Sequence, residues 1–212
     1  LSINVSAEDY DITVYNEHIT ADNLEIMGAN GGKATFDPAT MTLTLDNYDG
    51  NELDIYSESL ITLNIIGENK IVSTNEYNSS IDTSGDLLIT GTGSLLLQDS
   101  SCGIYNFYGN LYIENITLTI KDNKFGAIEV SKTEDGQGTV VITDATINID
   151  STRSGIEAKE NLYITNSTLN IKAKQEAFIA DKEIMIMDSN ITIDNTNEEE
   201  VSNCIEAFED VK

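Results

Sequence analysis

The sequence predicts an all-β fold: a single-stranded, right-handed parallel β-helix with about 22–24 residues and three short strands per coil. The first observation is a repeat, because five apolar residues in Gly155–Ile171 recur 22 residues later. The two copies are Ile156, Leu162, Ile164, Leu169 and Ile171, then Phe178, Ile184, Ile186, Ile191 and Ile193. The second is that apolar residues come in pairs two positions apart, which is the period of a strand with one buried face. A repeat of this length is typical of a solenoid.

Composition indicates one elongated domain and excludes two classes of function. The 212 residues include one proline and no useful helical stripe, whereas Ile, Val, Thr and Tyr, which favour strands, are abundant. There is no run of about 18 apolar residues, so we expect no membrane-spanning segment. The net charge is −26, from 37 acidic and 11 basic residues. Such a surface repels phosphate, so nucleic acid is excluded as a partner.

The N-terminal residues 1–33 do not fit the repeat. We expect them to cap the solenoid, because an open end leaves apolar side chains and strand edges unpaired. His18, the only histidine, is expected on the surface of this cap. Residues 34–212 are expected to form the β-helix. Lys212 falls within a repeat unit, so we expect the coils to continue beyond it in the natural chain.

One sharp turn is expected in every coil. A turn at Asp37–Pro38, within Ala34–Asp49, precedes an alternating strand that leads into the first coil. In the coils that follow, one position is always held by a residue type that tolerates a left-handed backbone. This position is occupied by Gly67, Gly91, Asn115, Asp144, Asn166 and Asp188. We expect the Asn and Asp side chains to bond along the stack, which is a structural role.

Two insertions and two cysteines interrupt the pattern. Ser131–Gly138 and Asn195–Asn203 either carry binding residues or mark places where the fold tolerates extra residues. Cys102 and Cys204 are expected four rungs apart, or ~19 Å at ~4.8 Å per rung. Because a disulfide needs Cα atoms within about 7 Å, both are predicted to be free thiols.

An apolar column is expected on the outer surface of the coils. It consists of the residues between the first apolar pair of each coil, namely Leu88, Tyr112, Val141, Tyr163 and Met185. Tyr112 and Tyr163 would lie ~9.6 Å apart, so sugar rings could stack on both. Exposed apolar patches usually mark contact sites. The alternative is that the N-terminal segment or a second subunit covers the column.

An acidic column is the candidate calcium region. Glu129, Glu157 and Glu206 are expected to share one outward column, with Asp181 and Glu209 close by, and Glu176 is a further candidate ligand. Stacked carboxylates repel one another unless a cation lies between them, and calcium takes oxygen ligands. The alternative is a set of hydrated carboxylates without an ion.

Catalytic residues are not assigned. On adjacent rungs, the carboxyl groups of Glu129 and Glu157 would have the separation of about 5 Å found in retaining glycosidases. Such pairs also arise by chance in so acidic a chain. A uronate lyase would need a basic residue beside calcium, and the only arginine, Arg153, is predicted in a turn. We therefore expect a binding protein rather than a lyase or a hydrolase.

Three stretches of the chain resemble a known family. ATFDPATMTLTLDNYD, LITLNIIGENKI and GIEAKENLYITNSTLNI are similar to secreted bacterial right-handed β-helix proteins described as carbohydrate-binding domains, which are relatives of the pectate-lyase-like solenoids. The resemblance extends from Ala34 to the C-terminus. It implies a calcium-dependent, non-catalytic binder of acidic plant polysaccharide such as polygalacturonate. Coils of that family often open with a calcium-binding Asp, whereas here this position holds Cys102, Phe125, Ser154, Glu176 and Asn203.

The function expected from the sequence is therefore glycan binding. The protein would be a secreted or cell-surface bacterial module that binds a polysaccharide, with calcium as a bridging cofactor. The chain begins with Leu1 rather than Met, and removal of a leader is expected. The alternative is a structural or adhesive surface domain that binds a protein or forms a homodimer through the apolar column.

Overall fold

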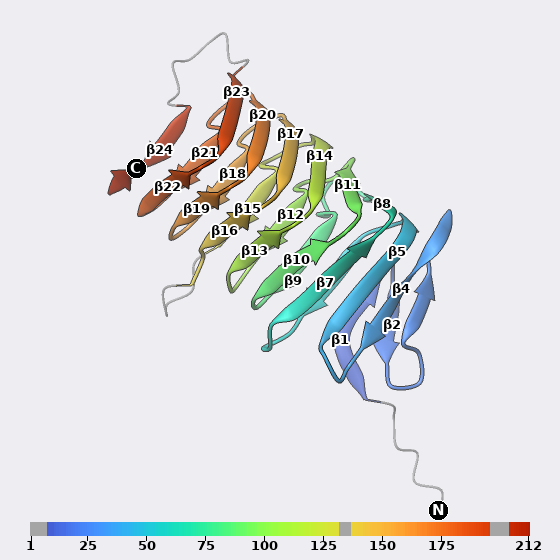
Figure 1. Ribbon diagram of the computed structural model, residues 1–212. Coiled ribbons are helices and arrows are strands. Elements are labelled where there is room, and N and C mark those ends of the chain that lie inside the picture. Colours follow the sequence, from blue (N-terminus) through green and yellow to red (C-terminus); the bar gives the residue numbers. More distant parts are fainter. Residues whose placement is uncertain (1–7, 132–136, 196–203) are drawn as a thin grey trace, which may run out of the picture.

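The computed structural model describes residues 8–131, 137–195 and 204–212. Within these ranges all regular structure is strand, and stacked parallel strands form a β-solenoid of about seven turns (Figure 1). The predicted parallel β-helix is confirmed. The described residues also contain no helix that is long and apolar enough to cross a membrane.

Each of the first six coils contributes one strand to each of three stacks, and the described part of the seventh contributes one strand to the first two. The first stack contains β6 (Leu53–Tyr56), β9 (Ile81–Ser84), β12 (Ile104–Asn106), β15 (Ile128–Val130), β18 (Ile156–Ala158), β21 (Phe178–Ala180) and β24 (Ile205–Ala207). The second contains β7 (Ile61–Ile66), β10 (Leu87–Gly91), β13 (Leu111–Glu114), β16 (Val140–Thr143), β19 (Leu162–Thr165), β22 (Glu183–Met187) and β25 (Asp210–Val211). The third contains β8 (Glu68–Val72), β11 (Ser94–Gln98), β14 (Thr117–Asn123), β17 (Thr146–Ser151), β20 (Thr168–Ala173) and β23 (Asn190–Asn195).

The strand β5 (Thr42–Gly50) joins the second and third stacks into one 16-stranded sheet. Its first half pairs with β7 and its last two residues pair with β8. Asn47 lies between these halves with φ of 49°, which turns the chain from one stack to the other. The first stack forms a separate 9-stranded sheet together with β1 (Asp9–Val14) and β2 (Glu17–Thr20).

The N-terminal strands close one end of the solenoid. β1 pairs antiparallel with β6, and the strands β3 (Glu25–Met27) and β4 (Gly31–Asp37) continue the other sheet antiparallel to β5. They therefore extend the two sheets beyond the first coil and do not lie over the apolar column (Figure 1). His18 is exposed, as predicted, and its Nδ1 lies 3.2 Å from Asp9 Oδ2.

The core consists of the residues that the repeat marked as inward-facing. In Gly155–Ile171 all five apolar residues of the repeat are buried. In the next copy Phe178 and Ile184 are buried, whereas Ile191 and Ile193 are half-buried. This difference arises because β23 pairs with β20 on one side and has no described strand on the other.

The predicted left-handed turn is present in every coil where it was expected. Its four Asn and Asp residues have φ between 50° and 54°, and Gly67 has φ of 71°. Gly91 has φ of 143°, a region that residues with a Cβ rarely adopt. Asn166 Nδ2 donates a hydrogen bond to Asp144 Oδ1 one rung away, so side-chain bonding along the stack is confirmed at this pair.

The two cysteines are unpaired, as predicted. Cys102 is buried and Cys204 is exposed. The amide of Ala177 donates to the carbonyl of Cys204, which places Cys204 one rung after Ala177. The two insertions fall largely on residues 132–136 and 196–203, which lie outside the described residues.

Candidate carbohydrate-binding groove

The structure assembles the predicted apolar column in register. Leu88, Tyr112, Val141, Tyr163 and Met185 pair successively through β10, β13, β16, β19 and β22. Each is half-buried and lies between two residues that point into the solenoid. Burial raises the pKa of both Tyr112 and Tyr163, and the Tyr163 hydroxyl donates to Glu183 Oε2 at 3.4 Å. Ligand binding at this column stays a prediction.

The predicted acidic column is only partly acidic. Glu129 and Glu157 are neighbours on adjacent rungs, as expected. Glu206 belongs to the same column, but Ile179 separates it from Glu157. In the other direction the column continues through Tyr105 to two aspartates that were not predicted, Asp82 and Asp54.

A lysine lies between two of the predicted metal ligands. Lys159 Nζ is 2.5 Å from Glu157 Oε1 and 3.9 Å from Asp181 Oδ1. Desolvation opposes the charged form of Lys159, but the bond to Glu157 and the surrounding carboxylates outweigh it and raise its pKa. An ammonium group thus offsets the repulsion for which a calcium ion was invoked.

The remaining predicted metal ligands are spread out. Glu176 precedes the strand β21 and Asp181 follows it, so they lie at opposite ends of this strand. The five residues from one to the other span roughly 16 Å in an extended chain. Glu129 Oε1 accepts a hydrogen bond from the amide of Gly126 at 2.9 Å. Across the described ranges no group of three or more His, Cys, Asp or Glu residues is placed to hold a metal ion. A calcium site therefore stays a prediction.

A groove that the sequence did not predict crosses the first stack of strands between coils 2 and 4. It has a volume of about 340 Å³, within the range of small-molecule sites. Its floor carries Asp82, Tyr105 and Glu129, together with Ser79, Ser101 and Cys102. Its walls carry the aromatic rings of Tyr77, Phe107 and Phe125, and Arg153 lies at its rim.

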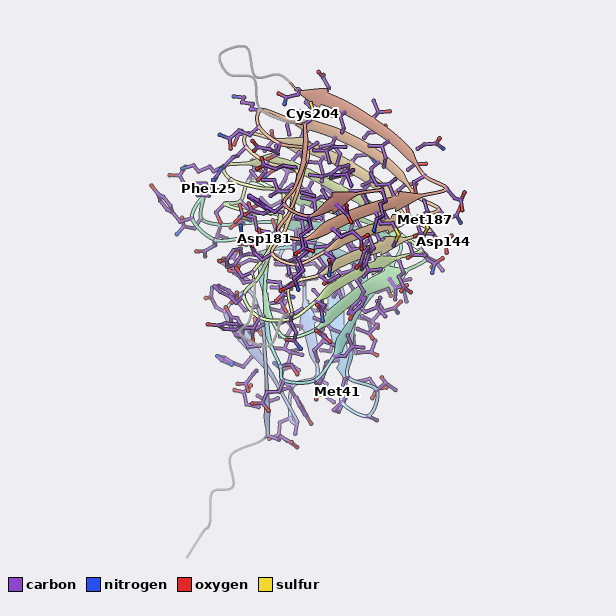
Figure 2. All side chains as sticks on the ribbon, turned by 90° about the vertical axis from the view of Figure 1, so that its left-hand side faces the viewer. Met41, Phe125, Asp144, Asp181, Met187 and Cys204 are labelled. Carbon is purple, nitrogen blue, oxygen red and sulfur yellow. The ribbon has the colours of Figure 1, made fainter. Side chains whose placement is uncertain are left out.

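The aromatic walls are open to solvent. Tyr77 is 72% exposed and Phe125 is 44% exposed. Figure 2 shows Phe125 at the edge of the molecule opposite Met187, which belongs to β22, and Asp144, which follows β16. Tyr105 and Phe107 meet edge to face, with ring centroids 4.5 Å apart. The groove therefore presents apolar ring surface beside its polar floor.

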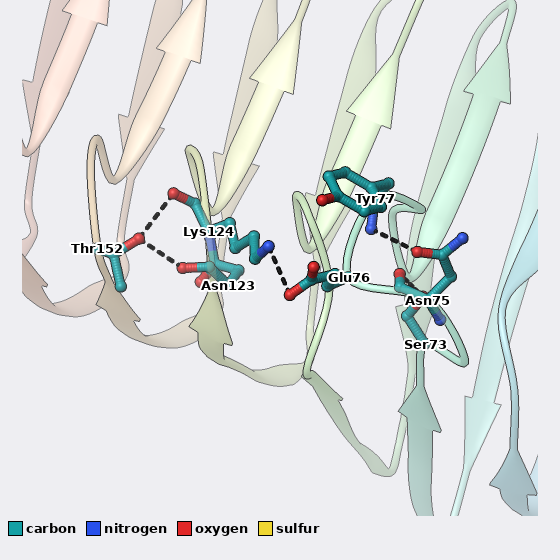
Figure 3. A network of polar contacts seen from close by, with 7 residues as sticks. All are labelled: Ser73, Asn75, Glu76, Tyr77, Asn123, Lys124 and Thr152. Carbon is teal, nitrogen blue, oxygen red and sulfur yellow. Dashed lines mark hydrogen bonds and ion pairs between the residues drawn. The ribbon is translucent and has the colours of Figure 1, made fainter.

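A long turn brings Tyr77 to the groove. The turn 73–80 between β8 and β9 is anchored at its start by buried Glu52, whose carboxylate accepts hydrogen bonds from the amide and hydroxyl of Thr74. Asn75 Oδ1 then accepts the amide hydrogen of Tyr77 at 3.0 Å. The turn reaches Lys124 two coils away (Figure 3).

Lys124 holds the tip of this turn through two contacts. Its Nζ lies 2.5 Å from Glu76 Oε2 and 4.8 Å from the centroid of the Tyr77 ring (Figure 3). The second contact is a cation–π interaction, which favours one orientation of the ring. Tyr77 is thus exposed but positioned, which is the condition for a ring that stacks on a ligand at little entropic cost.

The groove floor is electrostatically unusual. Desolvation raises the pKa of Asp82, and two hydrogen bonds from Ser79 only partly oppose this shift. Burial and the nearby carboxylate of Glu129 raise the pKa of the Cys102 thiol well above its usual range. Burial and the raised pKa both disfavour the thiolate of Cys102, which is the form that reacts as a nucleophile. Arg153 Nε donates to Gln175 Oε1 at 3.1 Å, which fixes the rim.

Exposed rings, carboxylate acceptors and a guanidinium group are the groups that bind sugars, because C–H faces stack on aromatic rings and hydroxyls donate to carboxylates. The family model described as carbohydrate-binding domain-containing protein matches residues 7–210. The chain belongs to this family. Searches of curated proteins and of solved structures found no match. Membership of a carbohydrate-binding family agrees with the expected polysaccharide partner and with the chemistry of the groove.

The signal that could have revealed the groove was weak. Tyr105, Phe107 and Tyr108 form a dense aromatic segment, and the turn 73–80 is longer than the turn 99–103 in the next coil. Neither feature belongs to the repeat, so the repeat pattern does not predict the aromatic segment or the long turn.

Proposed function

We propose that this protein is a non-catalytic, extracellular module that binds a polysaccharide in the groove between Tyr77 and Phe125. The observation that carries the proposal is the pair of exposed rings beside a floor that carries carboxylates. A sugar ring lying in the groove would place its apolar face against these rings. Its hydroxyl groups would donate to Asp82 and Glu129.

The charge of the floor favours an uncharged glycan. Asp82 and Glu129 accept hydrogen bonds from neutral hydroxyls without repulsion, and the one cationic group of the lining is Arg153 at the rim. A polyuronate would meet two carboxylates in a partly desolvated site, which is costly unless a cation intervenes. Calcium-bridged polygalacturonate is therefore the competing ligand in the test below.

Two contacts support binding rather than hydrolysis. Glu129 and Glu157 lie on adjacent rungs, yet Glu157 is held by Lys159 and Glu129 is turned toward the Gly126 amide. A retaining glycosidase needs both carboxyl groups directed at one scissile bond.

The test is a glycan array of β-glucan, mannan, xylan, chitin and polygalacturonate, probed with and without calcium and a chelator. We expect binding to a neutral backbone that survives chelation and weakens about tenfold in Tyr77→Ala and in Phe125→Ala. Tyr163→Ala is the matched control, because Tyr163 belongs to the apolar column on the other sheet.

Three outcomes would contradict parts of the proposal. Polygalacturonate binding that is lost on chelation would support the calcium-bridged mode instead. A loss confined to Tyr163→Ala would move the site to the apolar column. Absence of any glycan binding, together with dimers in solution, would favour the adhesive alternative.

A further inference from the structure

We infer that the bound glycan is a chain of several sugars that runs across the 9-stranded sheet along the direction of its strands. It ends in a second, larger cavity at the C-terminal ends of those strands. This inference rests on the proposed function and adds the path and the length of the ligand. Three observations support it. They are a second cavity, aromatic rings that lie between the two cavities, and polar residues that replace these rings farther along the solenoid axis.

The second cavity lies where the N-terminal cap meets the ends of β6 and β9. Its volume is about 680 Å³, which is twice that of the groove. Three tyrosines line it, namely Tyr10, Tyr56 and Tyr108. Tyr108 is 61% exposed and Tyr56 is 43% exposed, so their rings are accessible to a ligand. A site of this size with aromatic walls fits carbohydrate of more than one ring.

Aromatic rings connect the two cavities. Phe107 lines the groove and packs against Tyr105, and its ring centroid is 6.5 Å from that of Tyr56 in the second cavity. Tyr56 and Phe107 belong to coils two rungs apart and meet over Ser84, the small residue between them. The rings of Tyr105, Phe107 and Tyr56 therefore form a series of neighbouring aromatic side chains that leads from the groove to the second cavity.

The length of this path exceeds one sugar. Phe125 hydrogen-bonds through its amide to the carbonyl of Ser101, so the two lie side by side at the groove entrance. From Ser101 to Phe107 the chain advances six residues, which include the strand β12 and span at most roughly 20 Å when extended. Several pyranose rings in a row are needed to cover that distance.

The alternative path, along the solenoid axis, is interrupted. The residues that follow Phe107 in register on later coils include Lys159 and Asp181. Lys159 forms ion pairs with both Glu157 and Asp181. The next exposed ring at that edge is Phe208, four rungs from Phe107. A chain along the axis would lose stacking surface after the fourth coil, whereas a chain across the sheet keeps it.

The second cavity also restricts the charge of the glycan. It carries the carboxylates of Asp11, Glu58 and Asp86, and the described residues that line it include no lysine or arginine. Asp86 Oδ1 accepts hydrogen bonds from the amide and from Nδ2 of Asn110, which fix this carboxylate in the lining. Both ends of the path thus suit a neutral or amine-bearing chain and repel a uronate.

The experiment measures the affinity of the whole chain for di-, tetra- and hexasaccharides of β-1,4-glucan, mannan, xylan and chitin. We expect the hexasaccharide of the bound backbone to bind at least about tenfold more tightly than its disaccharide. Tyr108→Ala and Tyr56→Ala should weaken hexasaccharide binding about tenfold and leave disaccharide binding unchanged, whereas Tyr77→Ala should weaken both. Phe208→Ala is the matched control, an exposed ring at the same edge that should have no effect.

The outcomes separate the inference from the proposed function. Equal affinity for disaccharide and hexasaccharide, with loss only in Tyr77→Ala, would overturn the path across the sheet and leave the groove as the binding site. Loss of hexasaccharide binding in Phe208→Ala would overturn it in favour of the axial path. Failure of every oligosaccharide to bind would overturn the proposed function and the path together.

Discussion

Replacement of Lys124 by glutamine tests whether the position of Tyr77 matters for binding. Lys124 does not line the groove; it acts through the Tyr77 ring and through Glu76. Lys124→Gln removes the cation–π contact and the ion pair together, and it leaves a side chain of similar length. Tyr77 would then sample several orientations, and part of the binding energy would be used to order it.

The size of the effect follows from the geometry. The ammonium group is 4.8 Å from the ring centroid and partly exposed, and a cation–π contact of this kind contributes about 0.5–1 kcal/mol. The exposed ion pair to Glu76 adds little. We therefore expect glycan affinity to fall about two- to fivefold. Tyr77→Ala, which removes the ring itself, should have a larger effect.

The assay is calorimetric titration of the glycan identified on the array, with urea unfolding as a measure of stability. Lys124→Arg should restore affinity because guanidinium also stacks on tyrosine. Lys121→Gln is the matched control, since it makes the same change in net charge at a residue of β14 on another stack. Equal losses in Lys124→Gln and Lys121→Gln, or no rescue by arginine, would refute the positioning role.

Two further predictions concern stability. Since burial raises the Asp82 pKa above its ordinary value of 3.8, the folded state binds this proton more tightly than the unfolded state, and its carboxylate is destabilising at neutral pH. Asp82→Asn should therefore raise the urea midpoint at pH 7, and this gain should vanish as the pH falls below about 4; a gain that persists there would contradict it. Gly91→Ala should cost about 3 kcal/mol, because φ is 143° and a Cβ would overlap the backbone carbonyl oxygen of Ile65. Asn115→Ala at the equivalent turn, with φ of 54°, should cost about 1 kcal/mol in the same unfolding experiment. A larger loss of stability in Asn115→Ala than in Gly91→Ala would contradict this reasoning.

The repetition of outward-facing positions from coil to coil explains why one protein carries several candidate contact sites. A β-solenoid repeats each outward position at ~4.8 Å, so any residue type that recurs produces a column. The apolar column from Leu88 to Met185 and the carboxylates from Asp54 to Glu157 both arise in this way. A ligand site requires in addition a depression and residues whose orientation is held, and the groove beside Tyr77 has both.

The repeat in the sequence was sufficient to predict the fold, the inward residues and the left-handed turns. Parallel stacking places residues one period apart directly over each other, so a local pattern becomes a tertiary register without further information. For the same reason the neighbours Glu129 and Glu157, and the two unpaired cysteines Cys102 and Cys204, followed from counting residues.

The tertiary structure alone decided where the groove lies. Tyr77, Phe107 and Phe125 come from turns and strand ends of three coils and share no column, so no period relates them. The turn 73–80 bypasses the neighbouring turn to reach Lys124, and Lys159 takes the place between Glu157 and Asp181 where a cation was expected. The repeat specifies backbone register, but the length of a turn and the direction of its side chains depend on contacts between different coils. The sequence therefore determined the scaffold, and packing between the turns determined the site.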